Sequence, residues 1–229
     1  MSTATARYDG YADWYDETTS HWPTDEETAF LRQHVSSGRG AVCLDVGCGT
    51  GRYGAAVAAA GLRVAGVDLS RDQLRYARPR LGAAVCGDGR RLPFADGAIP
   101  VAMGMFFHTD VADFAAVVCE IARCLQPGGR FVYVGLHPCF LGPFVYRLEE
   151  SAERGLTFMP GYGRVGWSGR GSGDGTHVAG RVGFHHKTLE GLLGAFTGAG
   201  LCLHEVRELA GSGLVLPRHI GLVAQKLPA

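Results

Sequence analysis

The chain has 229 residues, of which 46% are hydrophobic and 19% charged, and this balance is typical of one ordinary globular α/β domain. Its 22 Lys and Arg residues equal its 22 Asp and Glu residues, so no excess charge favours binding to nucleic acid or to an anionic membrane. Without an apolar leader, a run of 18 apolar residues or a CxxC pair among seven cysteines, the sequence predicts a soluble cytoplasmic protein with free thiols.

From residue 26 onward, predicted helices and strands alternate along the chain. Short apolar runs predict strands at residues 41–46, 63–68, 83–86, 99–103 and 131–136. Helical apolar spacing and capping residues predict helices at residues 26–37, 52–60, 70–80 and 113–125. Strands that alternate with helices indicate a parallel sheet with helices on both faces.

The alternation stops at about residue 138 and resumes at Thr188. Residues 138–186 show no clear period, are rich in glycine, and contain several aromatic residues. A segment of this kind fits a lid over an apolar acceptor, and it fits a surface loop equally well. After it, a helix is predicted from Thr188 to Gly198, followed by strands at 201–207 and 219–226 whose short connection suits an antiparallel pair. We expect one domain over residues 1–229, with a lid or substrate-binding insertion at about 138–186.

The strongest motif is the glycine-rich run from Leu44 to Gly51, which follows a predicted strand and precedes a predicted helix. Glycines at this place allow a sharp turn and a close approach of the backbone to a ligand. The run also fits GxGxxG, the fingerprint of dinucleotide-binding proteins, through Gly49, Gly51 and Gly54. An acid after the next strand, Asp68, suits the ribose of either an NAD or an S-adenosylmethionine (SAM) site. Taken alone, these residues leave both cofactors open.

Further motifs favour one of these two cofactors. Gly87-Asp88-Gly89 follows the third strand, and a Leu-x-Pro-Gly-Gly turn at 125–129 precedes the fifth. Near the start of the chain, Tyr and Asp recur in a Tyr-Asp-x-x-Ala-x-x-Tyr-Asp pattern over residues 8–16. With the acid-x-Gly-x-Gly-x-Gly run at 45–51, these motifs resemble, in family order, the class I SAM-dependent methyltransferases that act on small molecules.

The resemblance implies a doubly wound, Rossmann-like methyltransferase fold of seven mostly parallel strands with the last one antiparallel. It implies SAM as cofactor, S-adenosylhomocysteine (SAH) as product, and methyl transfer to a small-molecule acceptor in biosynthesis or tailoring, with O-methylation favoured over N- or C-methylation. The cofactor-binding residues that it implies are Tyr15, Asp45, Gly47, Gly49, Gly51, Asp68, Leu69, Asp88, Gly89 and Gly104. Among these, Asp68 would hold the ribose, Asp88 the adenine amino group, and Tyr15 the methionine carboxylate.

A hydroxyl acceptor would need a base, and histidine titrates near neutral pH. Ligands of open α/β sheets bind at the carboxyl ends of the strands. We therefore rank as candidate bases His108, which follows the fourth strand, His137, which follows the fifth, and His186, where the 138–186 segment re-enters the fold. His34, His204 and His219 are interpreted as packing or surface residues.

Several alternatives stay open at this stage. An NAD-dependent dehydrogenase would use the same glycine loop, and a protein of methyltransferase fold could bind SAM without methylating. The neutral charge disfavours an RNA substrate, no histidine spacing requires a metal, and a homodimer is possible.

Overall fold

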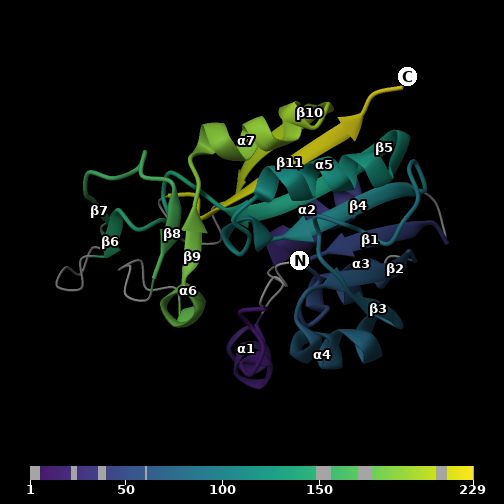
Figure 1. Cartoon of the computed structure of the whole chain (residues 1–229), viewed down its shortest axis with the longest axis horizontal. Helices are drawn as coiled ribbons and strands as arrows, with labels where there is room; N and C mark the ends of the chain where they lie inside the picture. Colours follow the sequence, from purple (N-terminus) through teal and green to yellow (C-terminus); the bar gives the residue numbers. More distant parts are fainter. Residues whose placement is uncertain are drawn as a thin grey trace.

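The core of the structure, a computed structural model, is a sheet of seven strands in the order β10-β11-β5-β4-β1-β2-β3 (Figure 1). The model describes residues 6–21, 25–35, 40–59, 61–147, 156–169, 177–209 and 216–228. The strands of the sheet are β1 (Val42–Val46), β2 (Arg63–Asp68), β3 (Ala83–Cys86), β4 (Ile99–Met105), β5 (Leu125–Leu136), β10 (Leu201–Leu209) and β11 (His219–Lys226). Paired strands are parallel except at β11, which runs antiparallel to β5 and β10. The predicted doubly wound sheet with an antiparallel last strand is confirmed.

Helices cover both faces of this sheet, and the side chains of β5 show how its faces divide. Phe131 and Tyr133 belong to the apolar cluster under α5 and α7, whereas Val132 and Val134 belong to the cluster under α2 and α3. α4 packs beside β2 and β3. The bounds of these helices are α2 (Asp25–His34), α3 (Arg52–Ala58), α4 (Arg71–Leu81), α5 (Phe114–Cys124) and α7 (Leu189–Gly198). None of the described helices is long and apolar enough to cross a membrane.

Local capping chemistry fixes several of these boundaries. The Ser70 hydroxyl accepts the Gln73 N–H at the start of α4, and the Thr188 hydroxyl accepts the Gly191 N–H at the start of α7. At the end of α5 the structure differs from the prediction. Leu125 already pairs with Ile99 of β4, so β5 begins six residues before the predicted start at 131.

The segment predicted to lack regular structure contains short elements among its described residues. β6 (Val145–Arg147) pairs with β7 (Leu156–Phe158), and β8 (Gly166–Ser168) pairs with β9 (Phe184–His186). α6 (His177–Val182) precedes β9. These elements gather beyond the carboxyl ends of the parallel strands (Figure 1). Runs of three residues are too short to show a period, which explains why the sequence did not reveal them.

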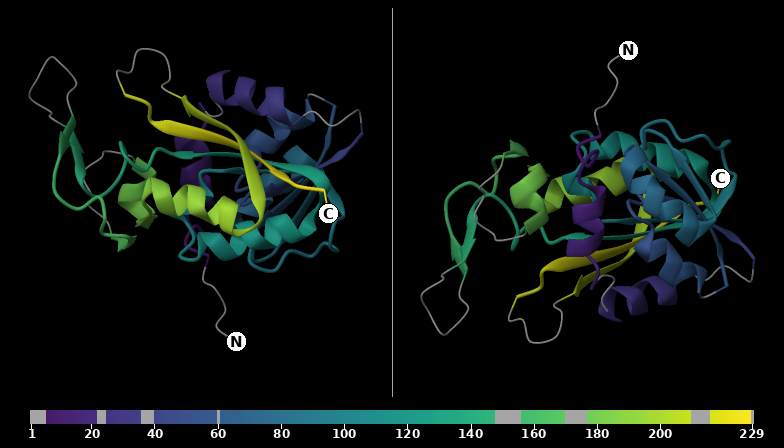
Figure 2. Two further views of the ribbon diagram at one scale, coloured as in Figure 1. Left: turned by 90° about the horizontal axis from the view of Figure 1, so that it is seen from above. Right: turned by 90° about the horizontal axis from the view of Figure 1, so that it is seen from below.

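A further helix that was not predicted, α1 (Ala12–Thr18), lies between α4 and α6 (Figures 1 and 2). It follows a described N-terminal stretch, residues 6–11, and we call residues 6–21 the N-terminal segment. Together with the 138–186 segment, it borders the carboxyl edge of the sheet, where the candidate site lies.

Candidate functional site

A cavity of about 520 Å³ lies at the carboxyl ends of four adjacent strands. Its floor is formed by the residues that follow β1 to β4, as expected for a ligand site in an open α/β sheet. Its roof comes from two parts of the chain that are far apart in sequence, the N-terminal segment and the 138–186 segment. The lining residues of the roof include Arg7, Tyr8, Tyr15, Val178, Ala179, Val182 and Phe184.

The loop after β1 has the strained backbone that its glycines permit. Gly47, Gly49 and Gly51 have φ angles of 68°, 52° and 81°, in the left-handed region that disfavours other residues. The N–H groups of Gly47 and Cys48 both donate to the carbonyl of Val67 on the neighbouring strand, at 2.8 and 3.1 Å. The loop is therefore tied to the end of β2, and Gly47 and Gly49 face the cavity.

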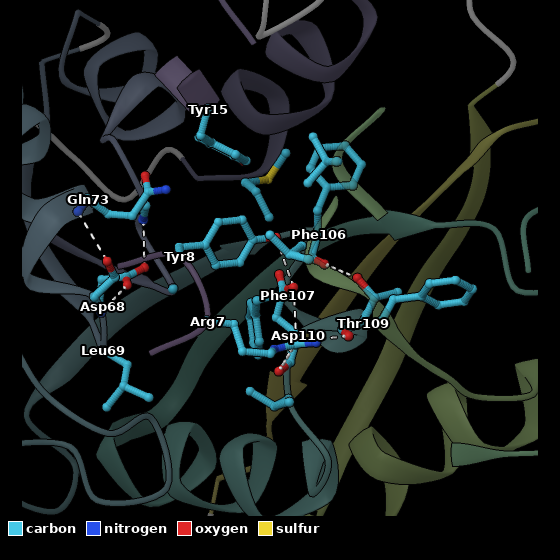
Figure 3. Close-up of a pocket in the computed structure, with 18 of the residues that line it drawn as sticks. Arg7, Tyr8, Tyr15, Asp68, Leu69, Gln73, Phe106, Phe107, Thr109 and Asp110 are labelled. Carbon is cyan, nitrogen blue, oxygen red and sulfur yellow. Dashed lines mark hydrogen bonds and ion pairs between the residues drawn. The ribbon is translucent and has the colours of Figure 1, made fainter. Parts of the chain in front are cut away.

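Asp68 joins this loop to the start of α4. One carboxylate oxygen accepts the N–H of Gly49 and the other accepts the N–H of Ser70, each at 2.8 Å. Burial raises the pKa of Asp68, and the two N–H donors oppose that shift. Asp68 lines the cavity, so its carboxylate is held in a fixed orientation with acceptor capacity toward a ligand (Figure 3).

Asp88 and its neighbours form the part of the cavity wall beyond β3. Asp88 accepts the Arg90 N–H at 2.9 Å, an Asx-turn geometry, and its other oxygen lies 2.6 Å from the Arg90 guanidinium. This guanidinium lowers the pKa of Asp88. Asp88 also lines the cavity together with Gly89 and Leu69, so the turn and a ligand contact are compatible. The predicted adenine contact stays a prediction.

Seven of the ten predicted cofactor residues line the cavity, namely Tyr15, Gly47, Gly49, Asp68, Leu69, Asp88 and Gly89. The other three do not line it, and each has a structural role instead. Gly51 begins α3, where an added Cβ would lie 3.0 Å from the backbone of Ala77. Gly104 leaves room for the ring of Phe107, because an added Cβ would lie only 2.3 Å from it. Asp45 is 1% exposed beneath the loop.

A cluster around Asp110 closes another side of the cavity, and it is absent from the predicted site (Figure 3). Tyr8 donates to Asp110 Oδ1 at 3.0 Å, and Arg7 forms an ion pair with the same oxygen at 3.2 Å. Burial raises the pKa of Asp110 to about 6, although Arg7 and Tyr8 oppose the shift. The guanidinium of Arg7 also stacks over the Trp167 ring at 4.7 Å, which ties the N-terminal segment to the 138–186 segment.

The three histidines predicted as candidate bases all lie outside the lining of this cavity. His108 is 2% exposed, its ring nitrogen lies 2.6 Å from the Tyr133 hydroxyl, and burial followed by the charge of Lys187 lowers its pKa to about 3. His137 accepts the Cys139 N–H and lies 3.1 Å from Glu208. His186 lies 2.8 Å from the carbonyl of Tyr162. Burial lowers the pKa of His137 and His186 as well. This placement argues against all three as bases.

His219 lines the cavity, although the sequence interpretation treated it as a packing or surface residue. The reason is topological. Because β11 runs antiparallel to β5, its first residue reaches the same edge of the sheet as the last residues of the parallel strands. The antiparallel pairing predicted for β11 is the signal in the sequence that points to His219, whereas the ends of the parallel strands point to the other histidines.

The charges around the glycine loop decide which cofactor fits it. Two carboxylates, Asp45 and Asp68, lie close enough for the charge of Asp68 to raise the pKa of Asp45, after the larger effect of burial. The nearby cations Arg52 and Arg80 both pair with Asp16. Such a site attracts a cation and repels the pyrophosphate of a dinucleotide.

Two buried polar atoms also favour a ligand that donates hydrogen bonds. Asp45 Oδ2 and Gln73 Oε1 are buried without a hydrogen-bond partner, and Gln73 lines the cavity. The amino group of SAM supplies a donor for Gln73 Oε1, and its positive charge suits the carboxyl groups of Asp68 and Asp45, so the residues present fit SAM. Among the described residues, no group of three His, Cys, Asp or Glu side chains is placed to hold a metal ion.

Comparison with known proteins agrees with this cofactor. Residues 44–133 match the model of a methyltransferase domain. A demethylmenaquinone methyltransferase from Corynebacterium kroppenstedtii is 37% identical over 99 residues, which are 43% of this chain and 43% of that protein. The O-methyltransferase cnsE from Penicillium expansum is 30% identical over 155 residues, 61% of this chain and 56% of that protein. The chain spans about half the length of the curated relatives it matches.

The fold has counterparts among solved structures. A SAM-dependent methyltransferase from Mesorhizobium loti superposes with a TM-score of 0.71 at 24% identity, covering 87% of this chain and 97% of that chain. SAM as the cofactor is supported by the seven-stranded sheet, by the glycine loop with its two carboxylates and by the matched domain. Residues 44–133 therefore carry a methyltransferase domain, within a sheet that has the fold of solved SAM-dependent methyltransferases.

Proposed function

We propose that the protein transfers the methyl group of SAM to a small organic acceptor, with a hydroxyl oxygen as the favoured methyl-accepting atom. The observation that carries the proposal is the pair of carboxylates, Asp45 and Asp68, beneath and beside the glycine loop of a cavity roofed by the chain itself. The Asp68 carboxylate, and an Asp45 carboxyl group that ionises readily when a cation arrives beside it, suit a sulfonium cofactor and oppose NAD. The methyltransferase is therefore favoured over the dehydrogenase.

The acceptor side of the cavity supports an apolar, flat substrate. Its wall includes Phe106 and Phe107 after β4, and Val182 and Phe184 from the 138–186 segment. The names of the two relatives, a demethylmenaquinone methyltransferase and an O-methyltransferase, agree with a small organic acceptor. We infer that this acceptor is a hydroxylated aromatic ring, and that residues 138–186 form the lid over it within one domain.

Within this proposal the residues act mainly by holding the reactants. SAM supplies an electrophilic methyl group when it is bound. Asp68 would orient the ribose, Leu69, Asp88 and Gly89 the adenine, and Gln73 the positively charged end. Holding two reactants in line lowers a barrier by roughly 7–11 kcal/mol in favourable cases, so positioning alone contributes much of the catalysis. The apolar roof would exclude water from the transfer.

Calorimetric titration with SAM, SAH and NADH tests the cofactor directly. We expect SAM and SAH to bind and NADH to give no heat. Asp68→Ala should weaken SAH binding by about 100-fold, because hydrogen bonds to a charged group contribute about 1.5–3 kcal/mol each. Asp96→Asn is the matched control, because this exposed carboxylate pairs with Arg123 away from the cavity. Binding of NADH alone, or SAH affinity unchanged in Asp68→Ala, would refute the proposed site.

A further inference from the structure

A chain of three polar side chains leads from the cavity into the protein behind it. His219, the first residue of β11, lines the cavity with its side chain 23% exposed. Its Nδ1 lies 2.9 Å from Oε1 of Glu27, whose side chain is 2% exposed. The hydroxyl of Tyr53 donates to the other oxygen of Glu27 at 2.7 Å. The three residues come from β11, α2 and α3, so three separate elements converge on one buried carboxylate.

This arrangement fixes the direction of the imidazole. A carboxylate beside Nδ1 favours the tautomer that carries its proton there, and this leaves Nε2 with a free electron pair. Burial and the charge of Glu27 raise the pKa of Tyr53, so its hydroxyl keeps the proton that it donates to Glu27. Glu27 thus has the Tyr53 hydroxyl as donor on one oxygen and the imidazole of His219 beside the other.

Phe106 holds the imidazole from the side of β4. Its ring centroid lies 4.9 Å from that of His219 and 5.9 Å from that of Tyr53. Phe106 has a φ of 61°, the one left-handed backbone among the non-glycine residues that the structure describes. Strained residues of this kind persist where the surrounding structure enforces them, and they gather at functional sites. The Phe106 N–H donates to Val134 at 2.7 Å, which enforces the turn at the cavity floor.

We propose that His219 is the catalytic base for the acceptor, positioned by Glu27 and Tyr53, and that the group it deprotonates is the hydroxyl of an aromatic ring. The inference rests on the proposed methyltransferase function and names its acceptor chemistry. Phe106 and Phe107 line the same cavity and would hold the ring, while His219 presents Nε2 to its hydroxyl.

The step is a proton transfer followed by a displacement. Nε2 takes the proton of the acceptor hydroxyl, and the imidazolium that results is paired with the Glu27 carboxylate. The acceptor oxygen forms a bond to the methyl carbon of SAM while the carbon–sulfur bond breaks, and the electron pair of that bond stays on sulfur. The products are the methyl ether and SAH, and the proton on His219 passes to water.

Other charged groups border the same part of the cavity. His21 lies in the N-terminal segment, Glu26 precedes Glu27 on α2, and Arg218 precedes His219. Each of them has its own interactions. Variants of His219 and Glu27 are therefore needed to assign deprotonation of the acceptor to this pair.

The experiment uses complexes with SAH and the probe 4-nitrophenol, whose phenolate form absorbs visible light. Wild type is compared with His219→Asn, Glu27→Gln and Tyr53→Phe. The matched control is His34→Asn, because His34 also lies beside a glutamate, 3.3 Å from Glu205, but it does not line the cavity. We expect wild type and the control to bind the probe with a larger phenolate fraction than free probe shows at the same pH. His219→Asn should lose this increase, and the other two variants should reduce it.

Turnover on a panel of phenols and quinols gives the second readout. His219→Asn should lower kcat by about 10²–10⁴-fold, the usual contribution of a general base, with a smaller change in KM. An increase in the phenolate fraction that survives in His219→Asn, or that is missing in wild type, overturns the proposal. Calorimetry with SAH on the same samples separates the two ideas, because failure to bind SAH overturns the proposed function, whereas binding without the phenolate signal overturns only the role of His219.

Discussion

At the scale of single residues, Asp45 is the most constrained group of the site. It is buried under the glycine loop, its Oδ2 has no hydrogen-bond partner, and an added Cβ on Gly54 would lie 2.9 Å from that oxygen. Burial, and then the charge of Asp68, raises its pKa to about 8. A carboxyl group in this state loses its proton readily only when a cation arrives beside it.

The stability of the protein without cofactor should therefore fall as pH rises. In the unfolded chain an aspartate ionises at a pKa of about 3.9, so between about pH 4 and about pH 8 the folded state binds more protons than the unfolded state. The contribution of Asp45 is fully present below pH 4 and is lost as pH rises through about 8. Asp45→Asn should leave the melting temperature nearly unchanged at pH 4 and raise it at pH 8, while it weakens SAM binding.

Thermal melts of the two proteins from pH 4 to pH 9, with and without SAM, measure this effect. Asp96→Asn serves as the control, because the exposed Asp96 carboxylate should not contribute. If the difference in melting temperature between wild type and Asp45→Asn stayed the same from pH 4 to pH 9, Asp45 would not be the source of the pH dependence.

Sequence could place most of the predicted cofactor residues at the cavity, because each follows a strand of a parallel sheet. Asp68, Leu69, Asp88 and Gly89 line the cavity for that reason. It could not separate lining residues from packing residues within one motif, since Gly104 supports Phe107 and Asp45 lies below the loop. It also missed partners that arrive from distant segments, such as the Arg7 and Tyr8 contacts to Asp110.

At the scale of elements, α1 is held over the cofactor side by acidic residues that face α4. Asp9 accepts from Ser70, Asp13 pairs with Arg75, and Asp16 pairs with both Arg80 and Arg52. The contacts of Asp16 are the strongest, because both of its oxygens accept from the Arg80 guanidinium, at 2.6 and 2.9 Å. Since Tyr15 lies on the same helix and lines the cavity, these ion pairs should control how the cofactor enters and leaves.

Asp16→Asn should speed the release of SAH by roughly 3–10-fold, since a half-buried bidentate ion pair stabilises more than an exposed one. Asp13→Asn is the matched control on the same helix, with a carboxylate that is 76% exposed and that should contribute little. Stopped-flow measurements at low and high salt report the release rates, and the difference between the two variants should shrink in high salt. Equal release rates for both variants at low salt would exclude this role of α1.

Elements with strong capping or apolar signals could be predicted closely, and weak ones could not. The predicted bounds of β2, β3 and β11 agree with the structure, and those of α4 and α7 agree to within one residue because Ser70 and Thr188 cap these helices. α1 was missed because its seven residues hold mainly aromatic and acidic side chains, and its position depends on ion pairs with α4 rather than on an apolar face.

At the scale of the whole molecule, the roof of the cavity is assembled from two segments that are far apart in the sequence. Arg181 of α6 stacks over Tyr11 and Trp14, and Arg7 stacks over Trp167 of β8. Two arginines thus join the N-terminal segment to the 138–186 segment across the cavity. The two residues of each contact lie more than 150 positions apart in the sequence. We therefore expect closure over the cofactor and closure over the acceptor to be linked.

A substitution that fills the acceptor side of the roof should distinguish binding of the cofactor from binding of the acceptor. Val178 lines the cavity from α6, and Val178→Trp places a large ring in the space proposed for the acceptor. We expect SAH affinity to stay within about threefold of wild type, while turnover of bicyclic phenols falls by at least about tenfold and that of single-ring phenols falls less, since overpacking acts on the space that it occupies. Val165→Trp is the control, because Val165 belongs to the same segment but is 65% exposed and does not line the cavity. Calorimetry with SAH and turnover of the two phenol classes make the comparison. If Val178→Trp lost SAH affinity as strongly as it lost turnover, α6 would border the cofactor rather than the acceptor. Unchanged turnover of both phenol classes would place the acceptor away from the 138–186 segment.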